Sequence, residues 1–159
     1  MKCFCFDWLA TIVTLTSRYS GSLTSAHSSY NRTVQSIGRY YYDPIPILVD
    51  KSGLYRIFTY SDTYLYVYLY NSTFDRRNST TNLMKSAYDT DFVRDLSFTI
   101  NLRTQIMYIL VITTVYSADT GSFNVTFTGP GNVIVVSSLT STVTTNRTAT
   151  TTRRTTTTS

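Results

Sequence analysis

The chain has 159 residues, a formal net charge of +5 and 42% hydrophobic residues, which suffices for one globular domain with a single core. Aspartate is its only acidic residue type and it has three lysines, whereas β-branched and aromatic residues are abundant, so the composition argues against a helical or α/β architecture and predicts an all-β fold. The basic residues are scattered along the chain without a dense cluster, so nucleic acid is not an expected partner.

The first predicted element is a leader over residues 1–17. Lys2 supplies a positive charge and residues 8–15 supply a short apolar stretch, as in a cleaved signal peptide, although Asp7 lies at the edge of that stretch. The alternative is a truncated or misjoined start. The apolar stretch is too short to span a bilayer and no later segment reaches the needed length, so we expect no transmembrane segment.

A single β domain is predicted over residues 18–136, and its first strands follow from local patterns. Residues 39–49 contain two prolines, Pro44 and Pro46, which cannot donate to a ladder, so this segment predicts an edge strand that bends. The runs at 54–60 and 64–70 are separated by a three-residue connection and are expected to pair as a hairpin.

The second half of the domain follows a polar loop from residue 71 to about 90. The nearly continuous apolar run at 106–115 predicts a central strand that is covered on both sides. Further strands are expected at 96–101, 123–127 and 133–136. Seven to eight short strands joined by turns predict a two-sheet antiparallel sandwich.

The run at 64–70 alternates strictly between tyrosine and aliphatic residues, which places two kinds of side chain on opposite faces of a strand. Its aliphatic residues are expected to face the core. Its tyrosines, if exposed, would form a linear platform on which sugar rings stack; in the alternative, they pack under a covering layer. The candidate glycan-binding residues are Tyr64, Tyr66, Tyr68 and Tyr70.

The loop that precedes residue 96 is the candidate metal site. Asp89, Asp91 and Asp95 supply carboxylate oxygens of the kind that calcium prefers, with Asp62 as a weaker candidate. The alternative is a solvated acidic loop, because the segment has no glycine to permit tight folding. Calcium is therefore the one cofactor that the sequence suggests.

Catalysis is not expected from the inventory of reactive residues. His27 is the only histidine, and it lies in a serine-rich stretch before the first predicted strand. A serine or cysteine nucleophile needs a positioned base, and no such arrangement is visible. Cys3 and Cys5 lie too close together for a good disulfide and are too few for a zinc site, so burial alone must stabilise the core.

Glycosylation signals favour an extracellular location. The acceptor pattern Asn-x-Thr occurs five times, at Asn31, Asn71, Asn78, Asn124 and Asn146. Asn124 is the doubtful acceptor because it falls inside a predicted strand. Residues 137–159 consist almost entirely of serine and threonine, which predicts a disordered, mucin-like stalk or, in the alternative, an unmodified linker.

Several segments together carry a resemblance to a known family. The segments at 108–114 (Tyr-Ile-Leu-Val-Ile-Thr-Thr), 120–125 (Thr-Gly-Ser-Phe-Asn-Val) and 129–133 (Gly-Pro-Gly-Asn-Val) resemble tandem extracellular repeats of some invertebrate surface proteins, which are similar to bacterial pre-peptidase C-terminal domains. Residues 18–25 are similar to the opening of such a repeat, and residues 62–67 to its Asp-x-Asp-Leu-Tyr-Val element. The glycines of the family's acidic loop are missing here.

The resemblance implies a jelly-roll-like sandwich attached to a secreted or surface protein, and it implies no catalysis. We therefore expect a non-catalytic structural or adhesive module, secreted or tethered at the cell surface, whose partner is an extracellular protein or glycan. Two alternatives stay open: a carbohydrate-binding module that uses the tyrosines, and an accessory domain detached from a larger secreted protein such as a peptidase.

Overall fold

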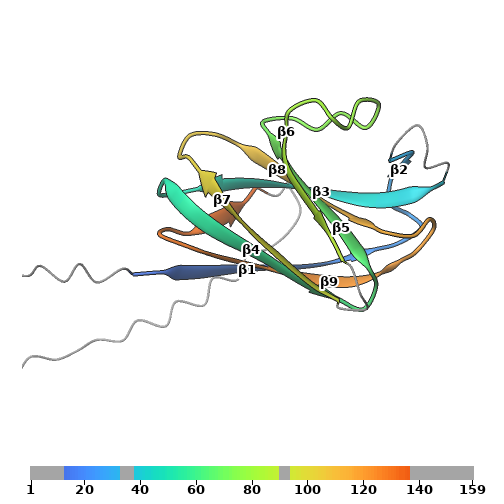
Figure 1. The fold of residues 1–159 in the computed structure, drawn as a ribbon, viewed down its shortest axis with the longest axis horizontal. Helices are drawn as coiled ribbons and strands as arrows, with labels where there is room; N and C mark the ends of the chain where they lie inside the picture. Colours follow the sequence, from blue (N-terminus) through green and yellow to red (C-terminus); the bar gives the residue numbers. More distant parts are fainter. Residues whose placement is uncertain (1–12, 33–37, 90–93, 137–159) are drawn as a thin grey trace, which may run out of the picture.

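The computed structural model describes residues 13–32, 38–89 and 94–136, and these residues form an all-β sandwich of two antiparallel sheets (Figure 1). The predicted fold class is confirmed. Residues 1–12 of the predicted leader and the whole predicted stalk, 137–159, lie outside the described residues. None of the described residues belongs to a helix with the length and apolar character that a membrane crossing requires.

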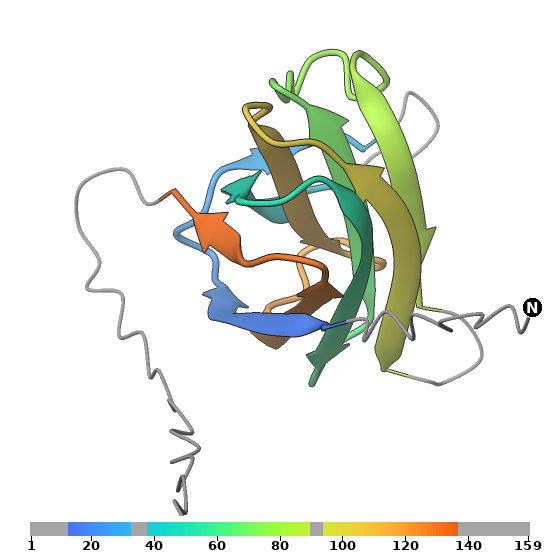
Figure 2. The same cartoon turned by 90° about the vertical axis from the view of Figure 1, so that its left-hand side faces the viewer.

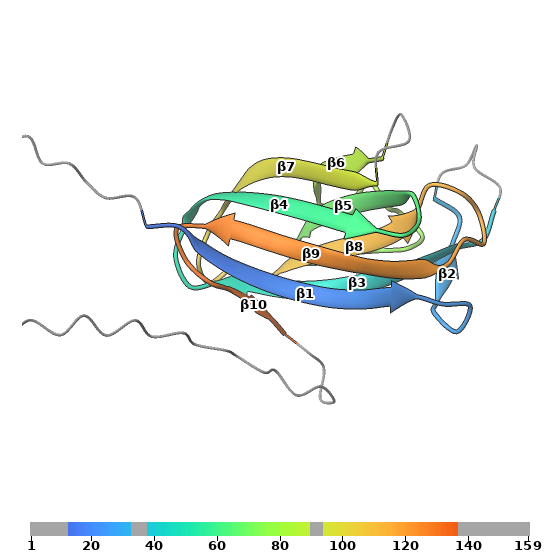
Figure 3. The ribbon, with the colours of Figure 1, turned by 90° about the horizontal axis from the view of Figure 1, so that it is seen from below.

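The first sheet has four strands in the order β1-β9-β4-β7. Figure 3 shows these strands side by side on the near side of the molecule, with the other sheet behind them. In β4, β7 and β9 the inward side chains are mostly buried and the outward ones are exposed or half-buried, which is the period-two pattern of a sheet with one buried face. The strands are β1 (Leu15–Leu23), β9 (Gly121–Gly129), β4 (Gly53–Ser61) and β7 (Asp95–Leu102).

The second sheet has six strands, with the order β10-β3-β8-β5-β6 and a short β2 that also pairs with β3. Every residue of β8 is buried, which confirms the prediction of a central strand covered on both sides. The strands are β10 (Val133–Val135), β3 (Tyr40–Val49), β8 (Tyr108–Thr114), β5 (Leu65–Asn71), β6 (Leu83–Tyr88) and β2 (Ser29–Tyr30).

The hydrophobic core lies between the two sheets. The predicted inward residues of β5 (Leu65, Val67 and Leu69) belong to it, together with large rings from both layers such as those of Tyr55 and Phe123. Figure 2, which looks along the strands, shows β1 of one sheet next to β10 of the other at one side of the sandwich. There the backbone N–H of Val133 donates to the Ser17 hydroxyl oxygen at 2.9 Å, which ties the layers together.

The predicted hairpin between residues 54–60 and 64–70 is wrong. β4 pairs with β7 and β9, whereas β5 pairs with β6 and β8 in the other sheet. The connection passes from one sheet to the other, and the buried Ser61 and Thr63 are joined there by a hydrogen bond from the Ser61 hydroxyl to the Thr63 carbonyl. Alternation specifies which face of a strand is buried but not which strand it pairs with, so the pattern was compatible with both arrangements.

The predicted edge strand lies inside the sheet but keeps one edge-like stretch. β2 pairs with Tyr40 and Tyr41, and β10 pairs with residues 47–49 of β3. Between these short partners, the only strand in the described part of the chain that pairs with residues 43–46 is β8. Both prolines fall in this gap, where a missing N–H donor costs no ladder hydrogen bond.

Three strands lie where the sequence predicted none: β1, β6 and the two-residue β2. β1 begins at Leu15, inside the predicted leader, and pairs with β9 along its whole length. β6 lies inside the predicted loop at 71–90, and its residues are exposed except for Ala87, which is half-buried. Mostly exposed edge strands carry little apolar alternation, so periodicity does not reveal them.

Candidate functional site

The outer face of the six-stranded sheet carries a layer of aromatic rings, which we call the aromatic face. Its residues come from β2, β3, β5 and the loop between β5 and β6: Tyr30, Tyr42, Tyr66, Tyr68, Tyr70 and Phe74. The Tyr66 and Tyr68 rings stack with centroids 4.5 Å apart. Phe74 meets Tyr70 at 5.0 Å and Tyr42 at 5.3 Å in tilted and edge-on contacts. Such pairs add stability beyond their buried area.

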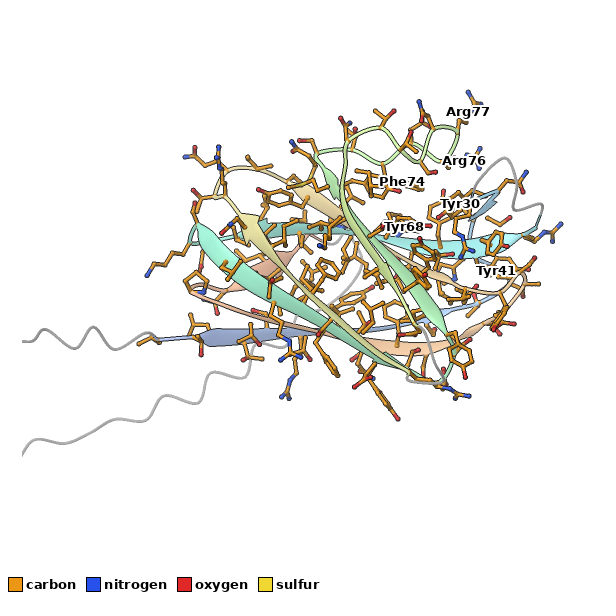
Figure 4. All side chains as sticks on the ribbon, in the orientation of Figure 1. Tyr30, Tyr41, Tyr68, Phe74, Arg76 and Arg77 are labelled. Atoms are coloured by element: carbon orange, nitrogen blue, oxygen red, sulfur yellow. The ribbon has the colours of Figure 1, made fainter. Side chains whose placement is uncertain are left out.

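The chain's own loops close the aromatic face. Figure 4 shows Phe74, from the loop between β5 and β6, turned toward the sheet near Tyr30 and Tyr68, whereas Arg76 and Arg77 of the same loop point away. The Tyr70 hydroxyl donates to the carbonyl of Ser79 at 2.9 Å, and this hydrogen bond anchors the loop to the sheet.

Arg32 completes the cover at the other end of the aromatic face. Its guanidinium lies 4.5 Å from the ring centroid of Tyr40 and 4.6 Å from that of Tyr66, so one cation contacts two rings. The same group donates to the carbonyl oxygen of Thr114 at 2.9 Å. The Tyr40 and Tyr66 ring faces that could accept an external cation or a sugar are thus used by the protein itself.

The four tyrosines predicted as a glycan platform do not form an exposed row. Tyr68 is 7% exposed and Tyr70 is fully buried, and burial raises the pKa of both hydroxyls well above the usual value of 10. Tyr64 and Tyr66 are half-buried, and Tyr64 has Tyr116 edge-on at 5.9 Å. The structure therefore corrects the picture of a continuous accessible stripe, because Tyr68 and Tyr70 are buried by packing.

The predicted calcium ligands are not gathered into one cluster in the described residues. Asp89 is 6% exposed, and one carboxylate oxygen accepts the Leu65 N–H at 2.7 Å while the other has no partner. Burial raises the pKa of Asp89, against the lowering effect of that hydrogen bond. Asp95 is exposed at the start of β7, and Asp91 lies outside the described residues.

Asp62 binds within the protein, since its carboxylate accepts the Ser122 hydroxyl at 2.9 Å. Across residues 13–32, 38–89 and 94–136, no group of three or more histidine, cysteine or acidic side chains is placed to hold a metal ion. Calcium binding stays a prediction.

His27 has a local role in a turn. Its backbone N–H donates to the Thr24 carbonyl at 3.1 Å, and its ring nitrogen Nδ1 accepts the Thr24 N–H at 3.2 Å. These contacts close the turn that follows β1.

The acceptor asparagines of the described residues are all on the surface. Asn31, Asn71 and Asn78 are exposed in loops or at a strand end, whereas Asn146 lies outside the described residues. Asn124 is inside β9, as the sequence predicted, but its side chain is on the outer face and exposed. A strand position on an uncovered face can therefore accommodate a glycan in the folded protein.

The outer face of the four-stranded sheet, which we call the open face, is uncovered by other described elements (Figure 3). The outward residues of β4 form its apolar column: Tyr60 is 59% exposed, Leu54 is 57% exposed and Phe58 is half-buried between them. Arg56 lies within the column, with its guanidinium 5.9 Å from the Phe58 ring and a hydrogen bond of 3.2 Å to the Ser97 hydroxyl.

Polar side chains flank this column in register on both sides. Across the sheet, Tyr60 lies between Asn124 and Asp95, and Phe58 lies between Thr126 and Ser97. Directly opposed residues have their Cβ atoms about 5 Å apart, so each ring has hydrogen-bonding groups within reach. The open face thus combines flat apolar surface with hydroxyl, amide and charged groups.

Sequence reasoning did not single out the open face, although its signal is present. Residues 54–60 alternate between Tyr55, Ile57 and Thr59, which are buried, and outward residues that include two aromatic rings. Their outward position could be read from the period of two, but the flanking polar residues could not, because they come from β7 and β9. Only the strand order brings these three strands together.

No family model matches the chain, and no curated protein is significantly similar to it in sequence. The resemblance to pre-peptidase C-terminal domains stays a prediction.

Proposed function

We propose that the protein is a non-catalytic, extracellular adhesive module, secreted or tethered at a surface, that contacts its partner through the open face. One observation carries this proposal: the open face presents Tyr60 and Leu54, both more than half exposed, among hydrogen-bonding side chains, whereas the aromatic face is closed by the chain's own loops. Exposed apolar surface with a polar surround is typical of interaction sites.

The extracellular part of the proposal is supported by the acceptor asparagines. All four that the structure describes have exposed side chains, so each can carry a glycan without unfolding the domain.

A second and more specific candidate function is carbohydrate binding through the open face. Tyr60 and Phe58 are two residues apart on one strand and provide flat apolar surface for sugar rings. Ser97, Thr126 and Arg56 offer donors and acceptors for sugar hydroxyls beside these rings. Sugar recognition needs both kinds of contact, and the open face places them side by side.

The test uses the full chain produced in bacteria, which leaves its asparagines unmodified. Binding is measured to a panel of immobilised extracellular polysaccharides and to intact cell surfaces. The Tyr60→Ser variant is compared with Tyr116→Ser, because both tyrosines are 59% exposed and only Tyr60 lies on the open face.

We expect Tyr60→Ser to weaken binding about tenfold, or about 1.4 kcal/mol, and Tyr116→Ser to leave it unchanged. Equal binding by both variants would rule out the open face as the contact surface. If the unmodified chain binds neither polysaccharides nor cells, the adhesive function itself is wrong.

A further inference from the structure

Asn124 combines a modification signal with a position inside the open face. In the acceptor pattern Asn124-Val125-Thr126, the first and third residues point outward from β9 because side chains two apart on a strand share a face. Asn124 is exposed and Thr126 is half-buried, whereas Val125 points into the core. The asparagine and the threonine hydroxyl that define the pattern therefore lie together on the open face.

The hydrogen bonds of Asn124 leave one branch of its amide for a glycan. The Ser20 hydroxyl of β1 donates to the amide oxygen Oδ1 at 2.7 Å. The amide nitrogen Nδ2, the atom that carries an N-glycan, is the other branch of the side chain and takes no part in this hydrogen bond. β9 lies between β1 and β4, so Asn124 has Ser20 of β1 on one side and Tyr60 of β4 on the other.

Tyr60 is the residue of β4 directly opposite Asn124. Opposed side chains in a sheet begin about 5 Å apart, which is within reach of the first sugar of an attached glycan. The exposed Tyr60 ring offers a flat apolar surface on which the C–H face of that sugar can stack.

We propose that Asn124 is an N-glycan acceptor, that its first sugar rests on Tyr60, and that its occupancy closes the open face to external partners. The closing effect rests on the proposed adhesive function, whereas the occupancy and the packing on Tyr60 do not. The glycan thus acts as a covalent regulator of the adhesive surface.

The modification is a group transfer from a lipid-linked oligosaccharide pyrophosphate. A bond forms between Nδ2 of Asn124 and C1 of the first N-acetylglucosamine, while the bond from C1 to the pyrophosphate oxygen breaks. The lipid pyrophosphate leaves and Nδ2 loses one proton, without any change of oxidation state.

Two other acceptors in the described residues, Asn71 and Asn78, offer controls that leave the open face uncovered. Asn71 and Asn78 belong to the end of β5 and the loop that covers the aromatic face, on the opposite side of the sandwich. Glycans at these positions are directed away from Tyr60.

Occupancy is tested first, with the full chain secreted from eukaryotic cells behind a signal sequence of known efficiency. Glycopeptide mass spectrometry then measures modification at each acceptor. We expect the Asn124 peptide to be modified, and the Asn124→Gln variant to lose the mass of one glycan. An unmodified Asn124 peptide would overturn the proposal, whether or not Asn71 and Asn78 are modified.

Packing is tested by trimming the glycans of the secreted chain to a single sugar and measuring the midpoint of thermal unfolding. We expect Tyr60→Ser to lower the midpoint of the trimmed protein more than that of the Asn124→Gln protein. Tyr116→Ser should lower both midpoints equally. An equal effect of Tyr60→Ser in both backgrounds would show that the first sugar does not rest on Tyr60.

Closure is tested by binding, with the polysaccharide or cell surface to which the bacterial chain binds best. Secreted Asn124→Gln protein should bind about tenfold more tightly than secreted wild type, whereas Asn71→Gln and Asn78→Gln proteins should bind like wild type. Equal binding by wild type and Asn124→Gln would contradict closure. Absence of binding by the bacterial chain would instead refute the adhesive function and leave the occupancy result standing.

Discussion

Tyrosines of this protein differ in role because of where the sheets place them. Tyr70 is fully buried with its hydroxyl bound to a backbone carbonyl, Tyr66 stacks between Tyr68 and Tyr88, and Tyr60 is mostly exposed on the open face. A buried ring stabilises the fold through its area and its hydrogen bond, whereas an exposed ring is free to contact a partner. Residue type alone does not separate these roles.

Phe74 is the residue through which the loop between β5 and β6 closes the aromatic face. We predict that Phe74→Ala lowers the free energy of unfolding by about 2 kcal/mol, less than the roughly 3–5 kcal/mol of a fully buried phenylalanine, because the ring is half-buried. Urea denaturation measures this change. The control is Arg76→Ala, an exposed residue of the same loop, and equal stability of the two variants would contradict the role of Phe74.

Asp43 gives the fold a predictable pH dependence. It accepts the Tyr19 hydroxyl at 3.2 Å between the sheets, and burial raises its pKa above the ordinary 3.8. The native state therefore holds the Asp43 proton more strongly than the unfolded state does, so the stability contributed by Asp43 falls as pH rises from about 3.8 through the raised pKa.

The Asp43→Asn variant should lack this part of the pH dependence, so its stability relative to wild type should increase as pH rises through that window. Denaturation midpoints at several pH values measure the difference, and Asp89, whose pKa is also raised by burial, is present in both proteins and cancels. Asp75→Asn, at an exposed loop position, is the control. A difference that does not change with pH would contradict the prediction.

At the scale of elements, β4 is the strand that serves both core and surface. Its inward side chains include Tyr55 and Ile57, which are fully buried in the core. Its outward side chains form the apolar column of the open face. Two neighbours hold it in place, β9 on one side and β7 on the other. Any displacement of β9 against β4 therefore disturbs the core and the open face together.

Gly129 of β9 tests this coupling, because a Cβ atom there would lie against the Tyr55 ring. That ring is fully buried and its hydroxyl donates to the Lys51 carbonyl at 2.6 Å, so it has little freedom to move. We predict that Gly129→Ala lowers the free energy of unfolding by about 2–3 kcal/mol through overpacking. Thr128→Ala, one residue earlier on the open face, is the control, and a similar loss in both would contradict a specific clash at Gly129.

The individual strands were largely predictable, but their pairing was not. The alternation in 64–70 correctly placed Leu65, Val67 and Leu69 in the core, and the apolar run of 106–115 correctly indicated a strand that is buried on both sides, because burial repeats with the period of the backbone. The partner of each strand depends on contacts across the core, which is why the hairpin of residues 54–60 and 64–70 was predicted wrongly. The open face was missed for the same reason, since it joins Tyr60 to residues of β7 and β9.

At the scale of the whole molecule, the two outer faces of the sandwich differ in what covers them. The six-stranded sheet carries a second aromatic layer over β3 and β5 that Phe74 and Arg32 cover, while its edge at β6 is exposed, with Tyr88 at 53%. The four-stranded sheet has the core on one side and an uncovered outer face with exposed rings on the other. This asymmetry is the physical basis for assigning partner contact to the open face and support to the aromatic face.

The most direct test of this assignment is chemical modification of tyrosine rings in the unmodified full chain, with and without the polysaccharide or cell-surface extract that it binds best. Peptide mass spectrometry then reports the reactivity of each ring. We predict that Tyr60 reacts in the free protein and becomes protected on binding, while Tyr88 and Tyr116 react equally in both states and Tyr70 reacts in neither. Protection of Tyr66 and Tyr88 with an unchanged Tyr60 would place the contact at the aromatic face and contradict the account.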